Sequence, residues 1–294
     1  MPKSISPLRY PGGKSVLLPI FQRLFVKNKI NTIIETHCGG AGLSLALIAN
    51  KTIKQAIIGD IDPLVSSFWD EILKNDIDKF IDRIRKVNVD MNTYNEQKDI
   101  YLNFKKGKKY SQFDLAFCFL FRNRTNRAGL LMAGPIGGYL QDANPKYKVH
   151  VRFNKERIIN RITRINLYSK KGLIIFKKID SIKMLSKYKS FKNCLFYIDP
   201  PYYQKGKDLY DSYYKHADHI ALYNKLLKLK DKTNFILSYD NSKEIEKIYK
   251  NFKYVKIGKI SHLANAKKQY ELLFYSDNIV IPSITSKLPE IIKQ

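Results

Sequence analysis

The sequence predicts an α/β fold in which a mostly parallel sheet carries helices on both faces. Short apolar runs at residues 32–34, 56–59, 173–176, 195–198 and 234–237 are each followed by a polar loop. Helical stretches separate these runs, and fully apolar strands are typical of sheets that are covered on both sides. The chain has 294 residues, of which 44% are hydrophobic, so it can bury a core of this kind.

A stretch of about 100 residues interrupts the alternation of strands and helices. Its first part is charged and helical, with apolar residues three and four positions apart. Further on, Gly137-Gly138-Tyr139 and Asn144-Pro145 predict the turns of a β-hairpin. We therefore predict a sheet domain built from residues 1–67 and 165–294, with an inserted, mainly helical domain at residues 68–164 that carries the hairpin.

The charge balance favours a polyanion as partner. Fifty-three Lys and Arg against 26 Asp and Glu give a net charge of +27, spread along the whole chain. An AT-rich genome also enriches Lys codons and is the simpler explanation for part of this excess. No lipidation motif or basic amphipathic helix supports membrane binding, and no apolar run reaches the roughly 18 residues of a membrane span. We expect a soluble, cytoplasmic protein that binds nucleic acid and no membrane.

The cysteines and histidines predict neither disulfides nor a metal site. Cys38, Cys118 and Cys194 are odd in number, far apart and without C-x-x-C spacing. His216 and His219 are the only close histidine pair, and they lack Cys or carboxylate partners at ligand spacing.

The strongest local signal is Asp199-Pro200-Pro201-Tyr202, which follows an apolar strand. Ligands of open α/β sheets bind at the carboxyl ends of strands, and this tetrad is expected there. Asp199 and the Pro200 carbonyl can accept hydrogen bonds from an exocyclic amine, which leaves its lone pair able to attack a methyl sulfonium. Tyr202 can stack on the base. The alternative is a tight turn at the end of a strand, since Asp-Pro and Pro-Pro are turn dipeptides.

The second signal is a glycine-rich turn between a strand and a helix, Cys38-Gly39-Gly40-Ala41-Gly42. Such a turn makes a cradle lined by backbone, and Asp60 ends the next strand about 20 residues on, where an acid commonly binds ribose hydroxyls. These features predict a nucleotide site. A dehydrogenase fits almost as well, and a turn that needs small residues only for packing is the simplest alternative.

Gly13-Lys14-Ser15 does not belong to a phosphate-binding Walker loop. That motif requires a glycine at position 8, which is Leu8, and an apolar strand before it, which is missing.

A basic loop in the insertion predicts contacts to nucleic acid. Arginines and asparagines alternate in it, and these side chains pair with guanine and adenine edges and with phosphates. The residues are Arg122, Asn123, Arg124, Asn126 and Arg127. A solvated basic loop is the alternative.

Together and in this order, the motifs resemble those of the Dam-type DNA adenine-N6 methyltransferases. Tyr10-Pro11-Gly12-Gly13-Lys14, the glycine-rich turn, Asp60, the insertion and the Asp-Pro-Pro-Tyr tetrad recur in that family. So do residues 124–129, Arg-Thr-Asn-Arg-Ala-Gly, and residues 267–273, Lys-Lys-Gln-Tyr-Glu-Leu-Leu. The resemblance covers nearly the whole chain. It implies a Rossmann-like, S-adenosylmethionine-dependent methyltransferase sheet with an inserted domain that recognises double-stranded DNA.

The resemblance also implies roles for residues by position. Catalysis falls on Asp199, Pro200, Pro201 and Tyr202. Contacts to S-adenosylmethionine fall on Tyr10, Gly12, Gly13, Lys14, Glu35, Cys38, Gly39, Gly40, Ala41, Gly42, Asp60, Asp180 and Asp199. Contacts to DNA fall on Arg122, Asn123, Arg124, Asn126, Arg127 and Tyr139.

The chain departs from the family before the glycine-rich turn. The family has Glu-Pro-Phe there, and this chain has Glu35-Thr36-His37. Losing the proline and the aromatic ring is expected to loosen the packing of the cofactor. The recognition insert also differs, so no target sequence is carried over.

We therefore expect a site-specific adenine-N6 methyltransferase that flips its target out of duplex DNA and methylates it in one in-line step. Cytosine N4 is an alternative target, although Ser more often replaces the acid in that group. An RNA adenine and a catalytically silent DNA-binding regulator are further alternatives, and the intact tetrad argues against the regulator. A companion restriction endonuclease and a bacterial or phage source fit the expected function, and the sequence sets no oligomeric state.

Overall fold

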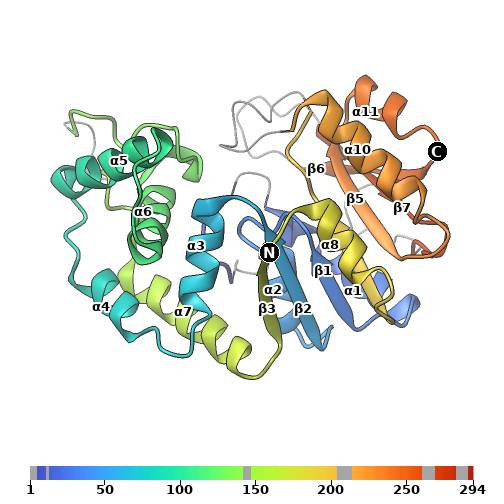
Figure 1. Ribbon diagram of the computed structural model, residues 1–294, viewed down its shortest axis with the longest axis horizontal. Helices are drawn as coiled ribbons and strands as arrows, with labels where there is room; N and C mark the ends of the chain where they lie inside the picture. Colours follow the sequence, from blue (N-terminus) through green and yellow to red (C-terminus); the bar gives the residue numbers. More distant parts are fainter. Residues whose placement is uncertain are drawn as a thin grey trace.

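The structure, a computed structural model, describes residues 5–10, 13–141, 147–203, 214–259, 269–282 and 291–293. An eight-stranded sheet forms one half of the molecule, and a group of helices lies beside it (Figure 1). The strands are β1 (Thr32–Glu35), β2 (Gln55–Asp60), β3 (Ile174–Lys178), β4 (Cys194–Ile198), β5 (Phe235–Asp240), β6 (Lys253–Lys259), β7 (Gln269–Tyr275) and β8 (Ile291–Lys293).

The strand order is β3-β2-β1-β4-β5-β7-β6-β8. The first five strands of this order run parallel, whereas β7 runs antiparallel to both β5 and β6. β1 pairs with β2 on one side and with β4 on the other, so the chain order reverses at β1. The predicted mostly parallel, Rossmann-like sheet is confirmed, and the reversal puts a ligand-binding crevice at the carboxyl ends of β1 and β4.

Helices cover both faces of the sheet because neighbouring strand residues point to opposite sides. On β1, Ile33 packs with one hydrophobic cluster and Ile34 with another. The first face is covered by α1 (Leu18–Lys27), α2 (Gly42–Ala49) and α3 (Pro63–Ile72), and the short helix η1 (Lys14–Leu17) precedes α1. The second face is covered by α8 (Ser181–Tyr188), α10 (His216–Leu227) and α11 (Lys243–Ile248).

The long connection between β2 and β3 is helical, as the sequence predicts. After α3 it contains α4 (Asp78–Lys86), α5 (Met91–Lys105), α6 (Gln112–Thr125), η2 (Arg127–Gly129) and α7 (Lys155–Lys170). These helices lie on the left of Figure 1, and aromatic rings join them: Phe68 of α3 stands 5.8 Å from Phe119 of α6. The predicted boundaries at 67/68 and 164/165 fall inside α3 and α7, and residues of both helices share a hydrophobic cluster with the sheet. The division into two domains therefore stays a prediction.

The prediction of a β-hairpin is wrong for the residues that the structure describes. Between η2 and α7 the described residues form turns, and one isolated bridge pairs Pro135 with Asn126, which precedes η2. The side chain of Gln141 replaces a ladder of backbone hydrogen bonds, since Nε2 donates to the Ile136 carbonyl at 2.9 Å and Oε1 accepts from the Val149 N–H at 2.8 Å. The glycines that suggested a hairpin instead turn the chain sharply, and Asn144-Pro145 lies outside the described residues.

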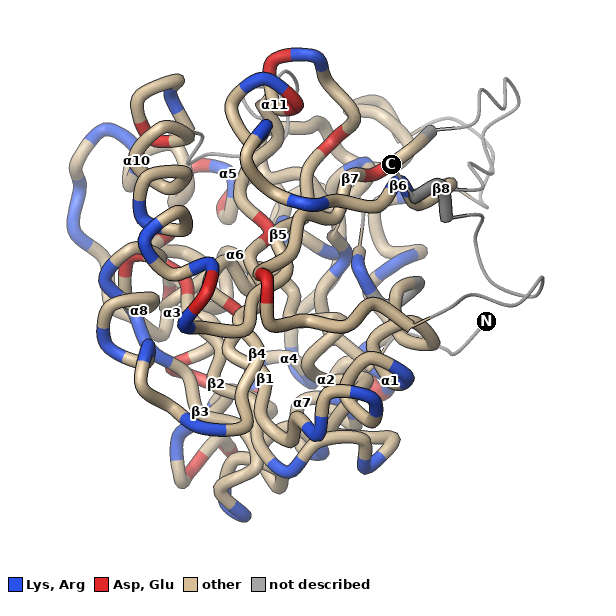
Figure 2. Tube along the Cα trace, turned by 90° about the vertical axis from the view of Figure 1, so that its right-hand side faces the viewer, with Lys and Arg blue, Asp and Glu red and all other residues tan. Residues whose placement is uncertain are grey.

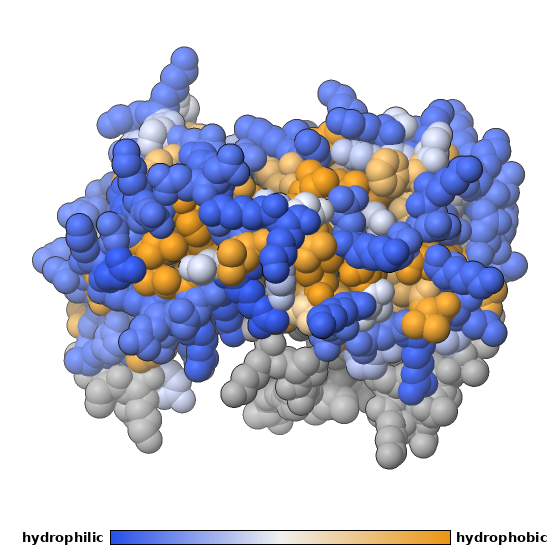
Figure 3. All heavy atoms as spheres, turned by 90° about the horizontal axis from the view of Figure 1, so that it is seen from below, coloured by the Kyte–Doolittle hydropathy of each residue, from blue (hydrophilic) through white to orange (hydrophobic). Residues whose placement is uncertain are grey.

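Charged side chains lie mainly on the outer helices and loops. The central strands β1 and β4 contain no Lys or Arg, whereas the surrounding helices carry many (Figure 2). Hydrophilic side chains cover much of the face that Figure 3 shows, with hydrophobic residues visible between them. Within the described part of the chain, no helix has the length and apolarity needed to cross a membrane.

Candidate active site

Acidic residues gather where the parallel strands end. Glu35 is the last residue of β1, Asp60 the last of β2 and Asp240 the last of β5, and Asp199 directly follows β4. Because these strands are parallel neighbours, their carboxyl ends meet at one edge of the sheet. The structure thus brings the predicted turn, Asp60 and the Asp-Pro-Pro-Tyr tetrad together.

Asp199 is held through one of its two carboxylate oxygens. Lys14 Nζ lies 2.8 Å from Oδ1, and Ser238 Oγ donates a hydrogen bond to the same oxygen at 2.6 Å. No described residue donates to Oδ2, and none donates to the Pro200 carbonyl. The side chain of Asp199 keeps 21% of its surface exposed. Two neighbouring acceptors therefore remain for a ligand that carries hydrogen-bond donors.

Lys14 joins the tetrad to a strand at the other side of the site. Its Nζ lies 2.6 Å from Glu271 Oε1 on β7 and donates to the Tyr202 hydroxyl at 3.2 Å. That hydroxyl in turn donates to Glu271 Oε1 at 3.2 Å, and Lys14 Nζ stands 5.2 Å from the centre of the Tyr202 ring. Lys14, predicted as a cofactor contact, is placed among the residues of the tetrad.

Burial and neighbouring charges shift the pKa values of Asp199 and Lys14. Burial raises the pKa of the Asp199 carboxyl, and Glu271 adds to the rise, while Lys14 opposes it. For Lys14, burial acts to lower the pKa, but Asp199 and Glu271 outweigh it and hold the pKa well above its ordinary value. Lys14 therefore stays cationic, and Asp199 is a better hydrogen-bond acceptor than a solvated carboxylate.

The glycine-rich turn is shaped by a tyrosine. Gly39 has a φ of +43°, and a Cβ at this position would come within 2.7 Å of the Tyr10 ring, which also packs against Gly40. Trp69 Nε1 donates to the Gly39 carbonyl at 2.8 Å, which fixes the other side of the turn. At Gly42, where α2 begins, a Cβ would meet nothing within 4 Å. The turn therefore presents open space at the start of the helix, as a backbone-lined cradle requires.

Asp60 faces this turn. Its Oδ2 accepts from the Gly39 N–H at 3.0 Å, and Oδ1 accepts from the Asp62 N–H at 3.0 Å. Burial, with a contribution from Asp62, raises the pKa of Asp60 to about 7. Each oxygen keeps lone pairs for further donors, so the arrangement suits the paired hydroxyls of a ribose.

Glu35 lies below the turn. It is 4% exposed, and Ser44 of α2 donates a hydrogen bond to its carboxyl group. Burial raises the pKa of Glu35 to about 8, so the group is largely neutral at pH 7. The thiol of Cys38 is buried as well, and burial holds its pKa well above the usual range.

His37 stands where the resemblance implies an aromatic ring. Its Nδ1 lies 3.0 Å from Thr36 Oγ1 and its Nε2 2.8 Å from the Tyr214 hydroxyl, which reaches Ser181 Oγ at 2.9 Å. Burial lowers the pKa of His37 to about 4, so the ring is neutral. A chain of hydrogen bonds thus connects the turn to α8 in place of apolar packing alone.

The other predicted cofactor contacts lie nearby or outside the described residues. Asp180 caps the start of α8, where its Oδ1 accepts from the N–H groups of Ile182 at 3.0 Å and Lys183 at 3.1 Å. The Gly13 N–H donates to the Tyr10 carbonyl at 3.2 Å, and Gly12 is outside the described part.

Four of the six predicted DNA contacts are buried. Asn123 is 1% exposed; its Oδ1 accepts from the Arg9 N–H at 2.7 Å, and its Nδ2 donates to the Arg9 carbonyl at 2.7 Å. Asn126 Nδ2 donates to the carbonyls of Leu130 and Leu131. Their amide groups hold the protein together, so they are unavailable to bases in this conformation.

The two buried arginines also bind the protein's own carbonyls. Arg122 donates to the Leu131 carbonyl and Arg124 to the Arg152 carbonyl. By contrast, Arg127 is exposed and Tyr139 keeps 57% of its surface exposed. Direct contact with DNA stays a prediction that the placement favours for Arg127 and Tyr139.

Two functional candidates were not predicted. Glu271 is 1% exposed in the middle of β7, and Ser238 lies fully buried in β5. The signal for Glu271 was an acid directly before the apolar run Leu272-Leu273-Phe274, which required a buried partner. Ser238 gave no comparable signal, since a serine in a strand is common.

Comparison with known families finds one matching family model. The family model described as D12 class N6 adenine-specific DNA methyltransferase matches residues 10–263, which include Tyr10, the glycine-rich turn, Asp60 and the tetrad. No curated protein matches the chain.

Proposed function

This chain belongs to the D12 class N6 adenine-specific DNA methyltransferases, an enzyme family, and on that premise we propose how its site works. We propose that the protein transfers a methyl group from S-adenosylmethionine to N6 of an adenine that is flipped out of double-stranded DNA. The observation that carries this proposal is a pair of acceptors, Asp199 Oδ2 and the Pro200 carbonyl, to which no described residue donates, beside Asp199 Oδ1, which Lys14 and Ser238 hold.

The residues around the glycine-rich turn suit S-adenosylmethionine. Residues 38–42 and the ring of Tyr10 would line the cofactor, and Asp60 would accept from its ribose hydroxyls. When bound, S-adenosylmethionine supplies an electrophilic methyl group on a sulfonium. Asp180, at the start of α8, would lie toward the adenine end of the cofactor.

Asp199 and Pro200 would make the adenine amine nucleophilic. An aromatic amine shares its lone pair with the ring, and two acceptors that bind its N–H hydrogens favour the pyramidal form in which the lone pair is free. The amine nitrogen would form a bond to the methyl carbon as the carbon–sulfur bond breaks, and the amine would give up one proton. Asp199 would be a base for that proton, since burial raises its pKa.

Lys14 and Glu271 would position this chemistry without touching the reacting atoms. Lys14 Nζ lies 2.8 Å from Asp199 Oδ1, which would leave Oδ2 for the substrate. Glu271 accepts from the Tyr202 hydroxyl at 3.2 Å and thereby fixes the ring on which the flipped base would stack. Pro201 restricts the backbone between Pro200 and Tyr202.

We also propose that the enzyme is cytoplasmic and of bacterial or phage origin. A companion restriction endonuclease would fit this function. The large positive charge supports a polyanionic substrate.

The direct test is to identify the methylated nucleoside. The protein is incubated with S-adenosylmethionine labelled in its methyl group and with duplex DNA of varied sequence, and the DNA is digested to nucleosides. We expect label in N6-methyladenine. Label in N4-methylcytosine, or label in RNA but not in duplex DNA when both compete, would contradict the proposal.

A further inference from the structure

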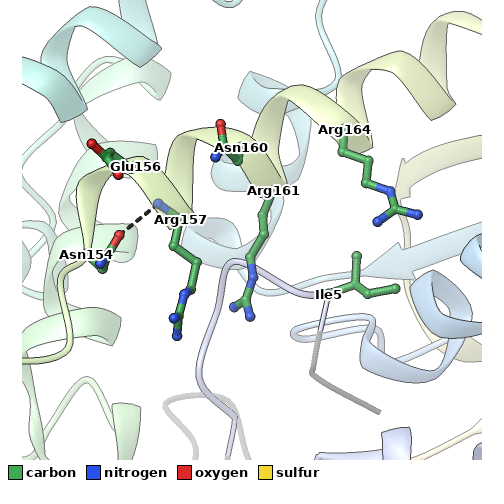
Figure 4. Close-up of a pocket in the computed structure, with 7 residues that line it drawn as sticks. All are labelled: Ile5, Asn154, Glu156, Arg157, Asn160, Arg161 and Arg164. Carbon is green, nitrogen blue, oxygen red and sulfur yellow. Dashed lines mark hydrogen bonds between the residues drawn. The ribbon is translucent and has the colours of Figure 1, made fainter.

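Helix α7 carries three arginines on one side. Arg157, Arg161 and Arg164 stand at i, i+4 and i+7, a spacing that brings side chains onto one face of a helix. Figure 4 shows their side chains extending from α7 into the same hollow, beside Ile5 of the N-terminal segment. We call these three residues the α7 arginine face. The remaining lining residues are Asn154, Glu156 and Asn160.

Further arginines add to the positive charge of this region. Burial and the nearby charges of Arg9, Arg161, Arg152 and Arg157 together lower the pKa of Arg124 to about 10. Among the described residues, no carboxylate forms an ion pair with any of these five arginines or with Arg164.

Glu156, the one acid that lines the hollow, does not neutralise the charge of the arginines. Glu156 projects from α7 away from the guanidinium groups of Arg157 and Arg161 (Figure 4). Guanidinium groups that crowd together without a counter-charge repel each other, and a bound anion removes that repulsion. The region is therefore suited to an anionic partner.

The N-terminal segment connects the α7 arginine face to the active site. Arg161 Nη1 donates to the Ser6 carbonyl at 2.7 Å, and Ser6 Oγ donates to the Gly40 carbonyl in the glycine-rich turn at 2.6 Å. Arg9, in the same segment, donates through Nη1 to the Asn126 carbonyl at 2.9 Å. One short segment thus separates the hollow from the site, so an extended substrate can contact both.

The dimensions favour a chain of phosphates over a single ion. Seven residues of α-helix separate Arg157 from Arg164, a rise of about 10 Å, which spans roughly three phosphates of one DNA strand. The hollow measures about 470 Å³, against the roughly 10–15 Å³ that a cavity needs on the same measure to hold one water. Guanidinium groups also match phosphate oxygens in pairs.

We propose that the α7 arginine face binds backbone phosphates of the DNA strand that runs past the target adenine. This inference rests on the proposed function. It assigns the contacts with the DNA backbone to residues outside the basic loop motif. The contacts involve phosphates only, so they strengthen binding equally for all sequences. The site holds the duplex in place, and base recognition falls to other residues.

The test compares two triple variants with matched charge loss and spacing. R157Q/R161Q/R164Q removes the α7 arginine face, and K243Q/K247Q/K250Q removes three exposed lysines at the same i, i+4, i+7 spacing around α11, on the other side of the molecule (Figure 1). Binding of a labelled duplex is measured by fluorescence anisotropy over a range of salt concentrations, and methylation rates are measured at saturating DNA.

We expect the arginine variant to bind DNA at least about tenfold more weakly at moderate salt. Its plot of log affinity against log salt should be less steep by about 2.7, since each lost phosphate contact removes about 0.9. In a variant that keeps Arg161, kcat at saturating DNA should stay within about twofold of the parent, because Arg157 and Arg164 lie outside the catalytic group. The lysine variant should keep the parent slope.

A double variant covers the case in which the triple variant unfolds. R157Q/R164Q keeps the Arg161 bond to the Ser6 carbonyl, and the slope should fall by about 1.8. An unchanged slope in the arginine variants, or equal losses in the arginine and lysine variants, would overturn the inference. A loss of affinity for single-stranded RNA with unchanged affinity for duplex DNA would also overturn it. Anisotropy measures binding without methylation. A failure of this inference is therefore distinguishable from a failure of the proposed function, in which the parent protein would make no N6-methyladenine.

Discussion

Polar motifs face opposite environments at the edge of the sheet and in the helical connection between β2 and β3. At the sheet edge, Asp60 and Asp199 lie where their strands end and face the crevice at the reversal of strand order. In the helical connection, Asn123 and Arg124 turn inward and bind backbone carbonyls. A polar residue at the end of a strand is therefore placed at the crevice by the sheet itself, whereas a polar motif on a helix can equally serve the interior.

The largest expected effect tests the sheet edge. Replacing Asp199 by Ala removes the acceptor for the adenine amine, so kcat should fall by about 10³-fold, while the affinity for duplex DNA changes by less than about threefold. Initial rates at saturating substrates and DNA-binding titrations measure both. Asp231→Ala, at an exposed acid, is the control and should match the parent. Full methylation by Asp199→Ala would remove the catalytic role from the tetrad.

The second prediction concerns the buried acid under the turn. The pKa of Glu35 is raised by burial to about 8, so its folded-state pKa lies above its unfolded value. The stability that protonated Glu35 contributes is complete below pH ~4 and is lost as pH rises through about 8.

Replacing Glu35 by Gln removes this dependence. Between pH 5 and pH 8, the free energy of unfolding of the parent should fall by on the order of 4 kcal/mol more than that of Glu35→Gln. Urea unfolding at several pH values measures the difference. Parallel curves for the two proteins would show that Glu35 is ionised in the folded state.

The third prediction separates the buried from the exposed half of the basic loop. Asn123→Ala leaves the Arg9 N–H and carbonyl without partners, so it should lower the free energy of unfolding by about 3 kcal/mol. Arg127→Ala, at an exposed side chain, should cost less than about 0.5 kcal/mol and weaken DNA binding instead. A stable Asn123→Ala protein with weakened DNA binding would reverse the comparison between the two regions.

The fourth prediction uses Lys14. Replacing it by Met removes the cation that opposes the rise in the pKa of Asp199, so that pKa should rise further. Activity is lost as pH falls through this pKa, and the acidic limb of the kcat/KM profile should move up by about one pH unit. Lys51→Met, at an exposed lysine, should leave the limb in place.

The smallest expected effect concerns the departure at His37. His37→Phe restores the aromatic ring of the family and removes the hydrogen bond to Tyr214, which should lower the free energy of unfolding by about 1 kcal/mol. The KM for S-adenosylmethionine should change less than about threefold. A tenfold fall in that KM would show that the histidine does loosen the cofactor site.

The sequence predicted the sheet well because its strands are short, wholly apolar and separated by helices. The predicted runs overlap β1 to β5, and the acids after them reach one edge through parallel pairing alone. The hairpin failed because the Gln141 side chain, and not a second strand, pairs with the backbone. No local pattern announces such a contact, since it depends on how the segment folds back on itself.

The sequence by itself determined which chemistry gathers at the strand ends, because strand periodicity and parallel pairing follow from local hydrophobic patterns. Tertiary structure decided the partners of those groups: Lys14 reaches Asp199 and Glu271 from the start of the chain, across elements far apart in sequence. It also decided which arginines face outward. The four buried residues of the basic loop became internal, while the α7 arginine face remained open, because burial is set by the packing of whole helices and not by the order of residues along one.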